Sequence, residues 1–321
     1  PVHGGKDGFR LFKDVNETGT GICNTCGAHS GIGLIAWAEG WDYLDAKDAV
    51  ADVLGMLPDT ASMPQLPVRK VKPVAAPALT KQEAKRRRNS LLNLWQEGVS
   101  TKHPTAEPLR LYLARRGLPT KGLNPEVFRF HPGLPYYSEE GERQGKHPAL
   151  LTRMVNEQGR GVTIHRTYLT PDGEKAAVEM ARKICLYDEC SHSLSGSAVR
   201  LTQPGRVLSV GEGIETMLSV LEATQMPTWA TTTATLLAAM AIPDEVEELW
   251  IWADKDRSRA GETYARKPCE RAWSEGRRAR IIFPHGEILA GRKPHDWNDT
   301  LRLHGLEGVA TGDRSAKLKM D

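Results

Sequence analysis

Residues 207–213 read Val-Leu-Ser-Val-Gly-Glu-Gly, an apolar run that stops at one carboxylate between two glycines. A short apolar run of this kind predicts a buried strand. The flanking glycines predict a tight turn from that strand into a helix. Glu212 is therefore expected at the carboxyl end of a strand, where open α/β sheets bind their ligands.

The rest of the C-terminal half repeats this alternation of strand and helix. Apolar runs predict further strands at residues 228–232, 249–253 and 279–283, and helices are expected from Ile214, Thr233 and about Arg259. Strands that alternate with helices and are apolar along their length are typical of a parallel sheet covered on both faces. We therefore predict an α/β fold here.

Two more acidic clusters follow strands of this predicted sheet. Asp254 and Asp256 are separated by one residue, so in an extended segment their side chains project together. Clustered carboxylates repel each other unless a cation lies between them, and hard oxygen ligands suit Mg²⁺. Asp296 is a candidate for the same site, although Asp296 or Asp299 could instead cap the helix that begins near Thr300.

The N-terminal segment contains a metal-binding pattern. Cys23 and Cys26 have the spacing of a zinc knuckle, which needs further ligands for tetrahedral zinc. Residues 9–19 read like a hairpin that would bring His3 beside the two thiols. The fourth ligand stays open between His29 and a cysteine upstream of Pro1, where we expect the natural chain to begin.

The amino-acid composition excludes several classes of protein. Lys and Arg total 43 against 40 Asp and Glu, a net charge of +3 that excludes a basic tail protein and an acidic tract. No apolar stretch reaches the ~20 residues of a membrane span. Five cysteines form no disulfide framework, so we expect a reducing, cytoplasmic setting.

The predicted domains are a zinc-binding domain (1–56), a Pro-rich linker (57–80), an α+β part (81–205) and the parallel-sheet domain (206–321).

The zinc-binding pattern and the acidic clusters together resemble a known family. Cys23-Asn-Thr-Cys26-Gly27, followed by a Gly-hydrophobic helix and Gly40-Trp41, resembles the zinc-binding domain of bacterial, phage and plasmid DNA primases. The order Gly-Glu-Gly, Asp-x-Asp and Asp-x-x-Asp resembles the Toprim domain, which primases share with topoisomerases and some nucleases. Two departures are Arg257-Ser258, which intervene before an Arg-Ala-Gly sequence, and His295, which replaces a usual lysine.

This resemblance implies roles for particular residues. It implies that Glu212, Asp254 and Asp256 are catalytic and, with Asp296, hold Mg²⁺ or Mn²⁺. It implies structural zinc on His3, Cys23 and Cys26. The segment 107–205 resembles, more weakly, the part of plasmid and phage primases that precedes Toprim, which implies that Arg166 and Lys183 bind template or nucleotide.

The function implied is a DNA primase of a phage, plasmid or other mobile element. Such an enzyme makes short primers on single-stranded DNA from nucleoside triphosphates by metal-dependent nucleotidyl transfer. No Gly-x-x-x-x-Gly-Lys-Ser/Thr loop occurs, so a replicative helicase would act in trans or in a longer chain. The alternatives are a Toprim nuclease and a non-catalytic zinc-ribbon accessory protein that binds DNA.

Overall fold

The structure is a computed structural model of the 321-residue chain. It describes residues 9–12, 15–23, 27–41, 43–53, 80–138, 141–188, 193–255, 260–284 and 296–310. The chain divides into two compact units, Pro1–Thr80 and Lys81–Asp321.

The first unit contains a small antiparallel sheet in the order β1-β2-β3. Phe9 lies opposite Cys23 in the β1–β2 pair, which confirms the hairpin expected over residues 9–19. Helix α2 ends at Gly40, whose φ of 71° is left-handed and whose N–H donates to the Ala36 carbonyl. The elements are β1 (Phe9–Leu11), α1 (Val15–Thr18), β2 (Thr20–Cys23), β3 (Gly27–Ser30), α2 (Ile32–Glu39) and α3 (Tyr43–Val53).

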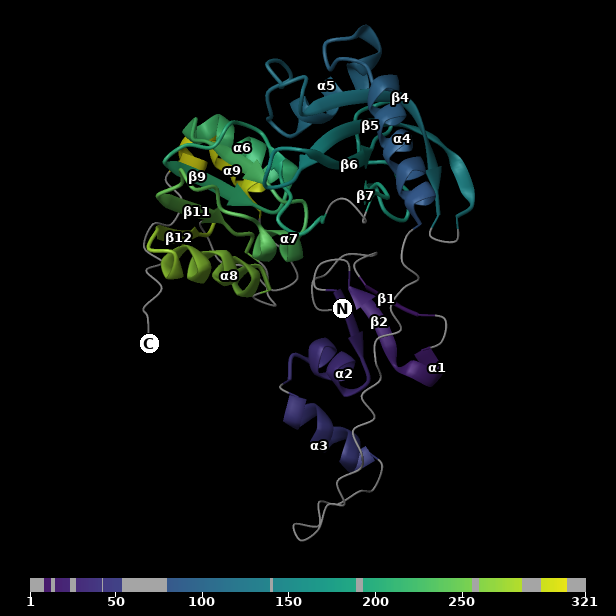
Figure 1. The fold of residues 1–321 in the computed structure, drawn as a ribbon, viewed down its shortest axis with the longest axis vertical. Coiled ribbons are helices and arrows are strands. Elements are labelled where there is room, and N and C mark those ends of the chain that lie inside the picture. The colour runs from purple at the N-terminus through teal and green to yellow at the C-terminus, as the bar shows by residue number, and fades with distance from the viewer. Residues whose placement is uncertain are drawn as a thin grey trace. The chain divides into compact units, whose positions relative to one another are not determined.

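The second unit begins with helices and an antiparallel four-stranded sheet in the order β4-β5-β6-β7 (Figure 1). Pro108 lies in the first turn of α5, and Gly117, with a φ of 64°, follows its end. The elements are α4 (Lys81–Glu97), the 3₁₀ helix η1 (Pro104–Ala106), α5 (Glu107–Arg115), β4 (Phe128–Tyr137), β5 (Arg143–Val155), β6 (Gly161–Tyr168) and β7 (Arg182–Ile184).

The two faces of this sheet pack against different partners. What we call the outer face carries Ile164 and Tyr168, which belong to an apolar cluster with Leu91, Leu94 and Trp95 of α4. The inner face carries Thr152 opposite His165 and Leu150 opposite Thr167. Apolar residues of the inner face share one core with α5 and with helices of the C-terminal half; those from the sheet are Phe128, Phe130, Leu150 and Met154.

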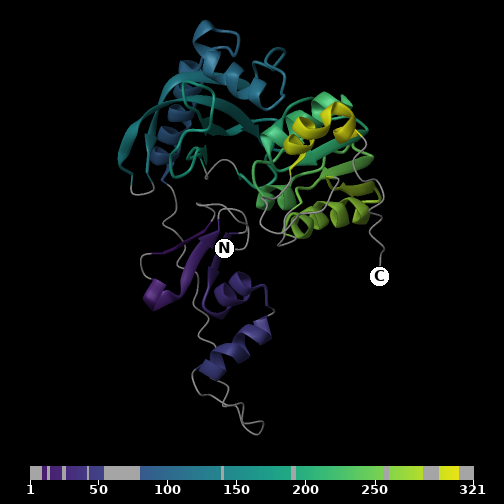
Figure 2. The same cartoon turned by 180° about the vertical axis from the view of Figure 1, so that it is seen from behind.

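The C-terminal half is a five-stranded sheet in the order β12-β11-β9-β10-β8, in which the first four strands are parallel and β8 is antiparallel. Helices α6 and α9 cover one face, and α7 and α8 the other (Figures 1 and 2). The predicted parallel sheet is thereby confirmed. The elements are β8 (Val199–Arg200), β9 (Val207–Gly211), α6 (Ile214–Thr224), β10 (Thr228–Ala230), α7 (Ala234–Ala239), β11 (Glu248–Trp252), α8 (Ala260–Ser274), β12 (Arg278–Ile282) and α9 (Trp297–Ala310).

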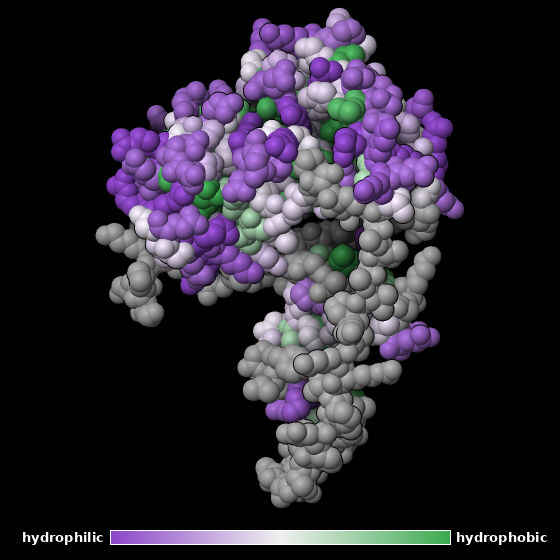
Figure 3. Space-filling view, in the orientation of Figure 1, coloured by the Kyte–Doolittle hydropathy of each residue, from purple (hydrophilic) through white to green (hydrophobic). Residues whose placement is uncertain are grey.

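The surface of the second unit is mostly polar. On the face shown in Figure 3, hydrophilic side chains cover most of the described part of residues 81–310. Large exposed apolar side chains such as Leu186 and Leu303 come from distant segments of the chain. Among the described residues, no helix has both the length and the hydropathy that a bilayer crossing requires.

Candidate active site

Glu212 lies directly after β9, as the sequence predicts. Its backbone carbonyl accepts a hydrogen bond from the Thr232 N–H at 2.8 Å, so the end of β9 is tied to the end of β10. A Cβ atom on Gly211 would lie 2.8 Å from the Trp252 carbonyl oxygen and 2.4 Å from the Met217 sulfur. Glycine is required here because the backbone of β11 approaches so closely.

Asp254 lies at the same edge of the sheet. In the parallel β9–β11 pair, Gly211 is opposite Trp252, so Glu212 and Asp254 leave neighbouring strands within one residue of the same level. The expectation that successive acidic clusters meet at one edge therefore holds for these two. Asp256, the third predicted carboxylate, lies outside the described residues.

Asp296 precedes α9 and is brought to the end of β11 by its neighbour. The indole N–H of Trp297 donates to the Ala253 carbonyl at 3.2 Å, one residue before Asp254. Asp296 Oδ1 accepts the Asp299 N–H at 2.7 Å, which confirms the alternative that this side chain caps the helix. Burial raises the pKa of Asp296, and the neighbouring Asp299 charge adds to the rise, against the lowering effect of the cap.

A further carboxylate, Glu215, lies in the first turn of α6 and is buried. The Tyr112 hydroxyl of α5 donates to it. Lys175 and Arg182 pair with its two oxygens at 3.7 and 3.9 Å. Burial alone would raise the pKa of Glu215, but the two cations and the tyrosine outweigh it and hold the pKa well below its usual range.

Glu215, Lys175, Arg182 and Tyr112 form what we call the Glu215 cluster. Its two cations interact electrostatically with the predicted carboxylates of the active site. Glu215 contributes most to the raised pKa of Arg182, and Glu212 and Asp254 contribute in the same direction. Burial lowers the pKa of Lys175, while Glu215 and Asp296 oppose that change. Arg182 is therefore coupled electrostatically to Glu212 and Asp254, and Lys175 to Asp296.

Sequence reasoning did not single out Glu215 or its partners. The sequence contained one signal, because Glu215 is the single charged residue within residues 214–220. The structure shows that this whole segment is buried. A charge placed in such a helix segment needs a partner. The partners themselves were not identifiable, since Tyr112 lies 103 residues away in the chain.

Arg166 and Lys183, the predicted nucleic-acid contacts, are paired with each other across β6 and β7 and share the outer face. Arg166 donates to the Tyr168 hydroxyl at 3.2 Å and to the Ile184 carbonyl at 3.4 Å. Lys183 donates to the Tyr137 carbonyl at 2.7 Å and lies over the Tyr136 ring. The structure thus places them away from Glu215, whereas Arg182 lies on the inner face.

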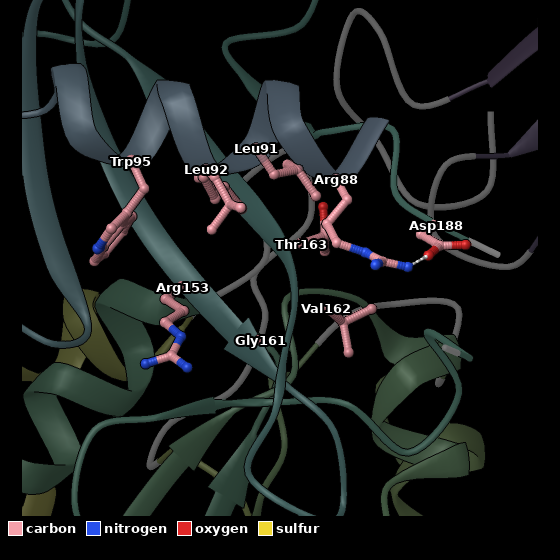
Figure 4. A pocket seen from close by; sticks show the side chains of 10 residues that line it. Arg88, Leu91, Leu92, Trp95, Arg153, Gly161, Val162, Thr163 and Asp188 are labelled. Carbon is pink, nitrogen blue, oxygen red and sulfur yellow. Dashed lines mark hydrogen bonds and ion pairs between the residues drawn. The ribbon is translucent and has the colours of Figure 1, made fainter. Parts of the chain in front are cut away.

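A cavity of about 360 Å³ lies between α4 and the outer face of β6 (Figure 4). Leu91, Leu92 and Trp95 project into it from α4, and the Arg88–Asp188 ion pair lies at its edge. Its place on the outer face separates it from the ends of β9 and β11, so it does not belong to the candidate active site.

The predicted zinc ligands are only partly described. Cys23 ends β2, opposite Phe9 and Gly27, and its side chain is buried. His3 and Cys26 lie outside the described residues. The His29 ring, the alternative fourth ligand, stacks on Trp37 with the ring centres 4.8 Å apart.

The donor chemistry of the site fits a hard divalent cation. Glu212, Asp254 and Asp296 offer only carboxylate oxygens, the ligands that Mg²⁺ prefers. Among the described residues, no group of three His, Cys, Asp or Glu side chains is arranged to hold a metal ion. The described residues thus supply oxygen ligands near one another but no complete coordination set.

Comparisons with protein families agree with this arrangement. Residues 207–307 match the Toprim domain, and residues 1–32 match the zinc-binding domain of primase-helicase. Residues 85–201 match a domain of unknown function, DUF7146. The combination of a Toprim domain with a primase zinc-binding domain confirms the resemblance to Toprim-type DNA primases.

Solved primase structures are also similar. The DnaG primase catalytic domain bound to ssDNA is 16% identical over 70% of this chain and 78% of that chain, with a TM-score of 0.47. A DNA primase domain from Pseudomonas aeruginosa is 15% identical over 71% and 75%, with a TM-score of 0.47. The Aquifex aeolicus primase, comprising zinc-binding and RNA polymerase domains, is 12% identical over 97% and 77%, with a TM-score of 0.45.

Proposed function

We propose that this protein is a DNA primase that synthesises short primers on single-stranded DNA by metal-dependent nucleotidyl transfer. The observation that carries the proposal is the placement of Glu212 and Asp254 side by side at the carboxyl ends of β9 and β11. This edge belongs to the part of the chain that matches the Toprim domain. The match of residues 1–32 to a primase-helicase domain favours priming over the other Toprim activities.

The proposed site uses Glu212, Asp254, Asp256 and Asp296 to hold Mg²⁺ or Mn²⁺. Bound there, a divalent ion would neutralise charge on the triphosphate and lower the pKa of the attacking hydroxyl. In the transfer, the 3′-hydroxyl oxygen of one nucleotide bonds to the α-phosphorus of the next and pyrophosphate leaves. In this proposal Glu212 would hold the metal or accept the hydroxyl proton.

The remaining predicted residues would serve the template. Zinc held by His3, Cys23 and Cys26 would stabilise the N-terminal domain that contacts single-stranded DNA, with the Pro-rich linker allowing its approach. Arg166 and Lys183 would contact nucleic acid on the outer face of the sheet. We further propose that a replicative helicase acts in trans or in a longer chain. The protein would serve the replicon of a mobile element and would be cytoplasmic.

The test is incorporation of labelled nucleotides on a single-stranded template with Mg²⁺ or Mn²⁺. We expect Glu212→Gln and Asp254→Asn to abolish incorporation while circular dichroism shows an intact fold. Glu222→Gln, which changes a carboxylate at the far end of α6, serves as the matched control and should retain activity. Undiminished primer synthesis by either site variant would refute the assignment.

The same assay separates the alternative functions. A Toprim nuclease would shorten the labelled template instead of producing primers. A non-catalytic accessory protein would bind the template without metal-dependent incorporation. Either result in the unmodified protein would replace the primase assignment.

A further inference from the structure

Two hollows on the second unit adjoin at Arg153 of β5. The first is the cavity of about 360 Å³ between α4 and β6, and Arg153 belongs to its lining. The second has a volume of about 260 Å³ and is lined by Arg153, by Arg200 of β8 and by the polar residues Asn124, Thr202 and Gln203. Because Arg153 lines both, a single ligand can reach from one hollow into the other.

The first hollow has an apolar wall. Its lining includes Leu91, Leu92 and Trp95 of α4 and Val162 of β6 (Figure 4). Arg129 holds Trp95 in place, because it donates to the Trp95 carbonyl at 2.9 Å and its guanidinium carbon lies 5.2 Å from the centre of the indole ring. A flat ring that entered this hollow would leave water for a preformed apolar surface.

Arg153 is partly buried and has no polar partner. Its guanidinium forms no hydrogen bond or ion pair with any residue that the structure describes. A Cβ atom on Gly161 would lie 3.1 Å from its Nε and 3.4 Å from its Nη2, so the group lies against the backbone of β6. Figure 4 shows it below Trp95. A charged group removed from water without a partner is costly, and an anion would supply that partner.

Arg200 is held firmly on the other side of the second hollow. Its Nη2 donates to the Asn156 and Glu157 carbonyls at 2.9 and 2.8 Å, and its guanidinium carbon lies 4.3 Å from the centre of the Trp229 ring. Its Nη1, which would lie 3.8 Å from a Cβ on Gly159, donates to nothing among the described residues. This guanidinium is therefore fixed in place with N–H groups left over.

Two acids border the hollows, and neither forms an ion pair with Arg153 or Arg200. Asp188, at the first hollow, is paired with Arg88. Glu126, at the second, is exposed and forms no ion pair within the described ranges. The second hollow thus has two cations against one solvated carboxylate, and this excess of positive charge favours an anionic ligand.

We propose that the two hollows together bind one nucleotide without a metal ion, with its base against Trp95 and Leu92 and its phosphate groups between Arg153 and Arg200. Guanidinium groups bind phosphate oxygens through paired N–H donors. The volume of the first hollow lies within the ~300–1,000 Å³ of small-molecule sites. This site is separate from the carboxylate edge, because β10 lies between β8 and β9.

The experiment is a calorimetric titration of the full chain with ATP, in buffer free of Mg²⁺ and Mn²⁺. We expect Arg153→Gln to weaken binding by about tenfold or more, since a hydrogen bond between charged groups is lost. This variant should fold normally, because the Arg153 side chain has no hydrogen bond to lose within the described structure. Arg200→Gln should weaken binding to a similar extent.

Arg160→Gln is the matched control, because Arg160 is an exposed arginine of the turn between β5 and β6 that lines neither hollow. It should bind ATP like the unmodified protein. An unmodified protein that binds no ATP up to ~1 mM would overturn the inference. So would an Arg153→Gln protein that binds ATP as tightly as the Arg160→Gln control.

A second pair of measurements tests the apolar hollow. Tripolyphosphate carries the phosphate groups of ATP without the base, so it should bind at least about tenfold more weakly. Leu92→Asp places a carboxylate in the hollow and should weaken ATP binding, whereas Leu303→Asp on α9 should not; these side chains are 54% and 68% exposed, so neither change disturbs a core. Equal binding of ATP and tripolyphosphate would overturn the inference.

Asp254→Asn separates this site from the proposed active site. Metal-free ATP binding should be unchanged in this variant, and its loss would place the nucleotide at the carboxylate edge and overturn the inference. A single-stranded oligonucleotide that bound through Arg153 and Arg200 when ATP did not would also overturn it, because the hollows would then be a nucleic-acid surface. Failure of primer synthesis would refute the proposed function and leave the ATP result standing.

Discussion

Arg182 and Lys183 are neighbours on β7, but they lie on opposite faces of the sheet and have different partners. Arg182, on the inner face, pairs with a buried carboxylate that also binds Lys175 and Tyr112. Lys183, on the outer face, reaches a backbone carbonyl and an aromatic ring. The cation on the inner face is therefore part of a charge network with a buried carboxylate, whereas the one on the outer face contacts only uncharged groups.

The largest effect of this difference is expected from Glu215→Ala. The substitution leaves Lys175 and Arg182 without their acid near a buried surface. We expect a loss of about 2–3 kcal/mol in the free energy of unfolding, below the ~3–5 kcal/mol of a fully buried pair because Arg182 is half exposed. Urea unfolding followed by tryptophan fluorescence measures it. If the loss is no larger than that caused by Lys183→Ala, the charge network of the inner face contributes no more to stability than the contact on the outer face.

The two faces can next be compared through their tyrosine hydroxyls. Tyr112→Phe removes a donor to a charged carboxylate, for which we expect a loss of about 1.5–3 kcal/mol. Tyr168→Phe removes two bonds on the outer face, the one that the hydroxyl donates to the Pro135 carbonyl at 3.1 Å and the one that it accepts from Arg166 at 3.2 Å. We expect a loss of about 1–1.5 kcal/mol, because Arg166 keeps its bond to the Ile184 carbonyl. Both values come from urea midpoints of the full chain. Equal losses would contradict a special role for the buried carboxylate of Glu215.

The pH dependence of the free energy of unfolding should reveal the buried histidine of the inner face, His165. Burial, with Arg182 adding to it, lowers the pKa of His165 to about 3. Between about pH 6.5 and pH 3, the unfolded chain thus binds a proton that the folded chain does not. The free energy of unfolding is therefore highest above about pH 6.5 and decreases as the pH falls below that value.

At pH 5.5 this loss amounts to about 1.4 kcal/mol, from an unfolded pKa of about 6.5. Urea unfolding at pH 7.5 and pH 5.5 measures it, with His165→Gln expected to remove this part of the pH dependence. The control is His304→Gln, which changes an exposed histidine of α9 and should keep the full dependence. A His165→Gln protein as pH-sensitive as the control would show that His165 is not the group responsible.

The smallest effect is expected from Lys183→Ala. Its ammonium lies 4.4 Å from the centre of the Tyr136 ring and is solvent-exposed, so we expect a loss of about 0.5–1 kcal/mol. If Lys183 contacts nucleic acid, as proposed, the same variant should also bind single-stranded DNA more weakly. Fluorescence anisotropy with a labelled oligonucleotide measures that change independently of stability.

The parallel sheet was predictable because its strands are signalled locally. The apolar runs before Glu212 and Asp254 mark β9 and β11, and the glycines mark the turn, so the common edge followed from the order of elements alone. The helix cap at Asp296 was predictable for the same reason, because a cap depends on residues three positions apart.

The Glu215 cluster was not predictable from local signals. Whether Arg182 or Lys183 lies on the inner face depends on the register between β6 and β7, and β7 is only three residues long. An alternating pattern cannot be read from so short a strand. The partner of a buried charge is set by tertiary contacts across the chain, which one sequence does not reveal.

The Tyr112–Glu215 hydrogen bond has a consequence for how the second unit folds. It joins α5 to α6 inside an apolar core that both share, although the two helices belong to segments with separate family matches. Neither segment alone would satisfy its buried groups. The two are thus expected to fold and unfold as one cooperative body, and a fragment cut between residues 205 and 206 would yield two unstable halves in place of two working domains.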